Sequence, residues 1–201
     1  MRGERVTVLP SGEPVDDVLV HPGSGVQPTD PCCPPGSPIV ARAHFPKTFG
    51  GELRGMRVEV RGRLLDVVGD PVRYQAPNTP TRWDVSADLA DFRMAEPFAL
   101  YREASAVDAL GDPVSVREEA ASGECRVQPS GSSDLEGAAD SARTTSVELW
   151  ARWTPELGAL CGGDTRGLAF EVMGRAYRVS QMLDVCSERR TVRIRGEAAD
   201  G

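Results

Sequence analysis

The two histidines of this chain, His21 and His44, carry the side chains best suited to acid–base chemistry near neutral pH. Such chemistry needs a carboxylate or a nucleophile within hydrogen-bond distance of the imidazole. No serine stands in a Gly-x-Ser-x-Gly motif, and no other recognisable motif supplies such a partner. We therefore expect both histidines to be structural or surface residues and the chain not to be an enzyme. An enzyme would instead need carboxylates that converge in a deep pocket.

Five cysteines are the candidate metal ligands and redox groups: Cys32, Cys33, Cys125, Cys161 and Cys186. Their number is odd, and no Cys-x-x-Cys spacing occurs. Zinc sites usually draw their ligands from two close pairs, whereas Cys32 and Cys33 are adjacent in a proline-rich segment. We expect no metal site, and reduced thiols in a cytosolic compartment.

Phosphate-binding motifs are also missing. The sequence has no Gly-x-x-x-x-Gly-Lys-Ser/Thr loop, and Lys47 is its sole lysine. The glycine-rich stretch GGDTRG at residues 162–167 lacks the strand-then-helix context that directs backbone N–H groups at a phosphate, so it predicts a turn. No cofactor is expected.

Composition favours a β protein. The chain has 201 residues, of which 40% are hydrophobic and 5% aromatic, with 21 glycines and 16 prolines, which favours many short strands and turns over long helices. The net charge of −7 argues against tight nucleic-acid binding, although an acidic passage would let DNA slide. No apolar leader is visible in residues 1–17, and no window reads as a membrane helix.

A sequence block recurs in the two halves of the chain. Residues 54–67 read RGMRVEVRGRLLDV, and residues 166–179 read RGLAFEVMGRAYRV. Half of these positions are identical without a gap, and other positions stay apolar, which indicates duplication of one structural unit. In both copies Gly-Arg follows the Glu-Val strand, which is typical of a tight hairpin turn because glycine adopts positive φ cheaply.

The flanking sequence repeats the same order of elements. Each half predicts a short strand that ends at a proline, a long polar loop, an alternating strand and then the repeated hairpin. The expected strands lie at residues 5–9, 18–22, 39–45 and 56–60, and at residues 125–129, 147–153, 168–173 and 191–195. We place the two units at residues 1–95 and 96–201. Residues 82–97 are the expected linker, with a short helical turn around residues 87–92.

Arginine and tryptophan supply the candidate contacts between subunits. Almost all bases are arginine, which forms two-pronged contacts with carboxylates; a codon bias explains the same composition. Salt bridges across a subunit contact are one interpretation of the repeated arginines, and solvated structural arginines are the other. Trp150 and Trp153 should face opposite sides of a strand, one in the core and one in a contact. The candidate interface residues are Arg54, Arg63, Arg166, Arg175 and Trp150.

The ordered motifs are similar to those of a known family. Val-x-Val-x-Pro (residues 18–22) and Cys-x-Val-x-Pro (residues 125–129) each precede a polar loop, and Gly-x-x-Leu-x-Val (62–67) and Gly-x-x-Tyr-x-Val (174–179) each close a hairpin. This pattern resembles the small β-barrel head–tail joining proteins of tailed bacteriophages, also called stoppers or head-completion proteins. The second half, residues 98–196, covers a whole unit, and the first is a shorter match. Two barrel units fused in one chain depart from the usual form of this family, which has a single barrel per chain.

The resemblance implies two tandem β-barrel-like units with long loops and little helix. It also implies a homo-oligomeric ring in the phage neck, between portal or adaptor and tail proteins, assembled in the host cytoplasm and part of the virion. DNA would pass through without specific binding, and no membrane is involved. Loops after the early strands, residues 22–38 and 129–145, would reach the channel and help to retain DNA. The candidate channel residues are Pro22, Asp30, Cys32, Cys33, Pro129, Asp134, Glu136 and Asp140.

The sequence does not decide the size of the ring or the function. Six fused chains would present twelve barrel units, so a hexamer is one hypothesis for the ring. The alternative function is a tandem β-barrel module of cellular origin that binds protein partners and has no role in a virion.

Overall fold

The computed structural model describes residues 2–74, 81–107, 110, 112–129 and 146–198. These residues are mainly strand, which confirms the predicted fold class. Contacts divide the chain into Met1–Phe92 and Arg93–Gly201. The first unit contains β1 (Glu4–Leu9), β2 (Glu13–Pro22), β3 (Ile39–Pro46), β4 (Arg57–Val60), β5 (Arg63–Arg73) and β6 (Trp83–Ala90). The second contains β7 (Glu96–Val107), β8 (Pro113–Pro129), β9 (Ser146–Arg152), α1 (Pro155–Leu160), β10 (Leu168–Val172), β11 (Arg175–Asp184), a 3₁₀ turn (Val185–Ser187) and β12 (Thr191–Ala198).

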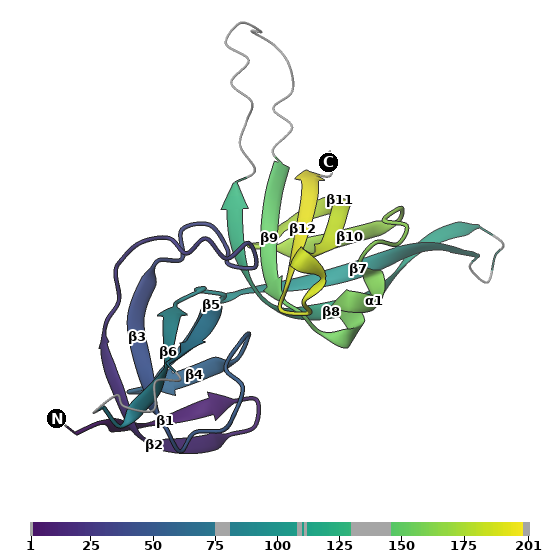
Figure 1. Ribbon diagram of the computed structural model, residues 1–201. Coiled ribbons are helices and arrows are strands. Elements are labelled where there is room, and N and C mark those ends of the chain that lie inside the picture. Colours follow the sequence, from purple (N-terminus) through teal and green to yellow (C-terminus); the bar gives the residue numbers. More distant parts are fainter. Residues whose placement is uncertain (1, 75–80, 108–109, 111, 130–145, 199–201) are drawn as a thin grey trace, which may run out of the picture. The chain divides into compact units, whose positions relative to one another are not determined.

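Each unit is a closed antiparallel β-barrel with the same strand order (Figure 1). The first runs β1-β2-β3-β6-β5-β4 and closes where β1 pairs with β4. The second runs β7-β8-β9-β12-β11-β10 and closes where β7 pairs with β10. Every strand of the first barrel therefore has a counterpart six strands later in the chain, which confirms the prediction of two tandem barrel units.

The repeated sequence block folds identically in both barrels. Val58 pairs with Leu65 across β4 and β5, and Phe170 pairs with Tyr177 across β10 and β11, at matching positions of the repeat. Two residues turn each hairpin, and both have positive φ: 50° and 74° for Arg61 and Gly62, and nearly the same for their counterparts. This is the type I′ geometry, whose twist suits two tightly joined antiparallel strands.

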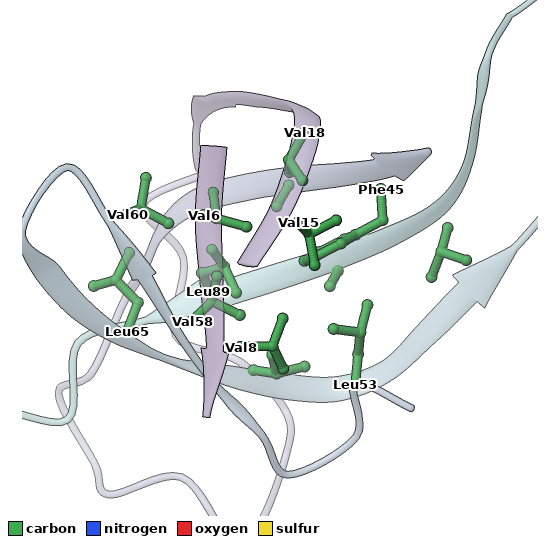
Figure 2. Close-up of a cluster of buried hydrophobic side chains, with 14 of the residues drawn as sticks. Val6, Val8, Val15, Val18, Phe45, Leu53, Val58, Val60, Leu65 and Leu89 are labelled. Carbon is green, nitrogen blue, oxygen red and sulfur yellow. The ribbon is translucent and has the colours of Figure 1, made fainter. Parts of the chain in front are cut away.

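Each barrel encloses its own hydrophobic core. Alternate residues of the strands point inward, because successive side chains of a strand lie on opposite faces. In the first unit the interior is rich in valine, and Figure 2 shows Val6, Val58 and Leu89 among its buried side chains. The second core has more rings, with Phe170 stacked on Tyr177 at 5.2 Å between ring centroids.

The predicted linker at residues 82–97 is wrong. β6 occupies half of it and completes the first barrel by pairing with β3 and β5. Val85, Ala87 and Leu89 alternate into the core, so the expected helical turn is also a strand. Alanine and leucine favour helices locally, but burial and pairing on both sides override that small preference.

The six-residue helix α1 distinguishes the second unit. The Thr154 Oγ1 accepts a hydrogen bond from the Leu157 N–H, Pro155 begins the helix, and the Leu157 side chain is buried. In the first unit Phe49 packs on Phe45 with ring centroids 5.0 Å apart. No helix within the described residues is long and apolar enough to span a membrane.

Candidate assembly surface

The second barrel carries a hairpin arm that leaves the closed sheet. β7 pairs with β10 from Phe98 to Arg102, but its pairing with β8 continues to Val107, opposite Pro113 (Figure 1). We call residues 104–107 and 113–116 the arm. Within the described residues the arm strands pair with each other alone, so the arm is a two-stranded ribbon.

Small apolar side chains line one face of the arm. Ala104 lies opposite Val116 and Ala106 opposite Val114, so these four residues share one face. Val114 is 41% and Val116 46% exposed, and Leu110, between the two strands, is 88% exposed. The arm therefore presents an apolar surface without a core beneath it.

Ion pairs fix the root of the arm to the barrel. Arg117 on β8 lies 3.2 Å from Glu103 on β7 and 3.0 Å from Glu171 on β10. The Glu103 N–H donates to the Gly167 carbonyl at 2.7 Å. Exposed ion pairs stabilise a protein only weakly, but these link three strands at the point where the arm begins.

The arm also has an open strand edge. β8 pairs with β9 from Cys125 to Pro129, and its residues 113–124 have no strand partner on that side within the described part of the chain. Unpaired N–H and C=O groups along a strand edge are a template for pairing with another chain.

The sequence carried a signal for the arm that our prediction missed. Gly-Asp-Pro at residues 111–113 is a turn sequence, and alternating Ala and Val lie on both sides of it. The first unit has a short β1–β2 connection at the equivalent place, so the repeat gave no guide to the arm.

The first predicted channel loop, residues 22–38, packs onto its own barrel. The Asp30 Oδ2 accepts a hydrogen bond from the Gly69 N–H on β5, and its Oδ1 accepts one from the Cys32 N–H, both at 2.9 Å. Pro22 ends β2 at the start of this loop and is exposed. Cys32 and Cys33 are buried, so neither lines an open surface in this conformation.

Burial also raises the pKa of buried cysteines. It raises the pKa of Cys33 to about 11, with the Asp30 charge adding to the effect, and it raises the pKa of Cys125 to about 12. All five cysteines are free thiols, and Cys186 is the exposed one. Thiolate chemistry at neutral pH is therefore disfavoured at Cys33 and Cys125.

The second predicted channel loop is mostly outside the described residues. Pro129 ends β8. Asp134, Glu136 and Asp140 lie in the segment 130–145, which the structure does not describe.

The predicted interface arginines are exposed, and three of them already have carboxylate partners in their own unit. Arg54 pairs with Asp70. Arg63 lies 3.3 Å from Asp91, and Arg166 lies 2.8 Å from Asp164. Arg175, at the start of β11, is exposed.

Trp150, the predicted contact residue, is buried in this chain. It is 4% exposed, its Nε1–H donates to the Glu148 Oε1 at 2.8 Å, and the Arg193 guanidinium lies 5.9 Å from its ring centroid. Trp153 is half-buried and packs against the second core. Both tryptophans therefore pack within this chain.

In the described part of the chain, no group of three or more His, Cys, Asp or Glu side chains is placed to hold a metal ion. Comparison of the sequence with known proteins gave no match to a family model and no significant match to a curated protein.

Proposed function

We propose that this chain is a structural connector of a phage or prophage neck, forming a ring between portal or adaptor and tail. The ring lets DNA pass and helps to retain it. The hairpin arm is the observation that supports assembly most directly, because it combines an apolar face and an open edge. The phage assignment rests on the motif resemblance at residues 18–22, 62–67, 125–129 and 174–179.

The arm is poorly suited to stand alone in water. An isolated two-stranded ribbon is marginally stable, and a third strand or a covering apolar surface is needed to stabilise it. A neighbouring chain that covers Val114, Val116 and Leu110 would remove their exposed apolar area from water, which contributes about 25 cal/mol per Å².

An arm that docks on a different surface of the next copy forms a head-to-tail contact. Contacts of that kind generate rings when the rotation closes. A tandem of two equivalent barrels gives the ring two barrel units per chain. The acidic net charge suits a passage in which DNA slides without being held tightly.

Electron microscopy of the purified full-length protein, combined with light-scattering mass measurement, tests the proposal. We expect rings with a central hole and, for six fused chains, a mass six times 21.6 kDa. A ring of twelve full chains would reject the six-chain hypothesis while keeping the connector.

A protein that remains monomeric at all accessible concentrations would contradict self-assembly and favour the cellular binding module. Neighbouring genes provide an independent test, because portal, capsid and tail genes beside this one are expected for a neck connector.

A further inference from the structure

Both histidines of the chain meet on the outside of the first barrel. His21 on β2 and His44 on β3 are separated by 22 intervening residues, yet their Nε2 atoms lie 2.9 Å apart. Their ring centroids are 5.0 Å apart, with the planes inclined by 27°. The strand register makes them diagonal neighbours, because His21 lies opposite Arg42 and His44 lies opposite Leu19.

A backbone carbonyl orients the first imidazole. The His21 Nδ1 lies 3.1 Å from the Pro22 carbonyl oxygen, which can only accept, so Nδ1 carries the proton. The His21 Nε2 then accepts a hydrogen bond from the Nε2–H of His44. A bound ion would replace that proton, which His44 would carry on Nδ1 instead. Histidines that bind metals usually donate their second ring N–H to a carbonyl or carboxylate, as His21 does here.

We propose that His21 and His44 form a two-imidazole chelate for a divalent transition-metal ion of the Zn²⁺, Ni²⁺ or Cu²⁺ class. Imidazole nitrogen is a preferred ligand of these ions. Two nitrogens bound tetrahedrally at about 2.0–2.1 Å from zinc are about 3.3 Å apart. The 2.9 Å separation seen here is a few tenths of an ångström shorter, and the rings meet nitrogen to nitrogen. Both rings must therefore turn until their lone pairs converge on the ion.

The surroundings of the pair permit a cation. Arg42 is the adjacent positive charge, but it forms a two-pronged ion pair with Asp88, at 2.5 and 2.9 Å, which offsets that charge. His21 is exposed, so water completes the coordination of the ion.

Calorimetric titration of the tag-free full-length protein with Zn²⁺ and with Ni²⁺ tests this site. We expect one ion per chain, and His21→Gln and His44→Gln should each weaken binding at least about tenfold. Cys186→Ser is the matched control, because Cys186 is an exposed thiol that could bind zinc by itself. That variant should bind as the unaltered chain does.

Copper spectroscopy gives a second readout that needs no variant. Cu²⁺ bound to the unaltered protein should show electron-paramagnetic hyperfine coupling to two imidazole nitrogens. Circular dichroism should show that both histidine variants remain folded. Three results would overturn the proposal: binding that persists in both histidine variants, binding that disappears in Cys186→Ser, or no detectable binding at sub-millimolar metal.

Discussion

Gly196 on β12 lies directly against the ring of Phe170 on β10: a Cβ atom added at Gly196 would stand 2.4 Å from Cε1 of that ring. By strand register, the equivalent positions of the first barrel are Leu89 and Val58. The first barrel has the larger residue, Leu89, on β6 and the smaller one, Val58, on β4. The second barrel has the small residue, Gly196, on β12 and the large one, Phe170, on β10. We call this reversal of side-chain sizes between the two cores the volume exchange.

Gly196→Ala should therefore destabilise the second unit by about 1–3 kcal/mol, because the new methyl group overlaps the ring. Adding Phe170→Leu should recover part of that loss, so the two changes are not additive. Chemical unfolding followed by tryptophan fluorescence measures both effects. A neutral Gly196→Ala, or strictly additive changes, would contradict the volume exchange.

Alkaline pH should weaken the fold through its buried thiols. Burial raises the pKa of Cys125 from 9.0 to about 12, so the folded chain holds this proton more tightly than the unfolded chain does. The resulting stabilisation is complete below pH 9 and is lost as pH rises toward 12, by at most about 1.4 kcal/mol per pH unit. Cys125→Ala should flatten the decline in unfolding free energy, whereas Cys186→Ser should not. Equal slopes for the two variants would refute this cause.

The loop at residues 22–38 should depend on Asp30. Asp30→Ala removes the acceptor of two backbone N–H groups, at Cys32 and Gly69, and should cost about 1–3 kcal/mol. It should also speed proteolytic cleavage within the loop. Asp16→Ala, which removes an exposed ion pair with Arg5, is the control and should change little. Unchanged proteolysis of Asp30→Ala would show that other contacts hold the loop.

The repeated hairpin was predictable because local signals agree with the fold. In RGMRVEVRGRLLDV the apolar alternation, the glycine turn and the repeat at residues 166–179 all favour the same hairpin. β6 was not recognised, because its Ala-Asp-Leu-Ala run favours a helix and only pairing with β3 and β5 decides otherwise. The approach of His21 to His44 depends on the register of β2 against β3, which no local pattern specifies.

Trp150 shows the limit of reasoning from spacing. Strand alternation puts it on the face opposite Leu149 and Ala151, which is correct, but alternation does not tell whether that face meets solvent. Glu148 and Arg193 accommodate the indole within the chain. The contact surface we infer lies instead on the arm, in a segment without a counterpart in the first repeat.

The arm should be dispensable for folding and required for assembly. Val116→Asp places a charge on its apolar face, opposite Ala104, where a docked neighbour would have to desolvate a carboxylate. Because Val116 is 46% exposed and outside the core, the melting temperature should stay nearly constant while the ring dissociates. Val72→Asp, at a 52% exposed valine of the first barrel, is the matched control. Light scattering measures both, and rings that survive Val116→Asp would exclude the arm as the assembly contact.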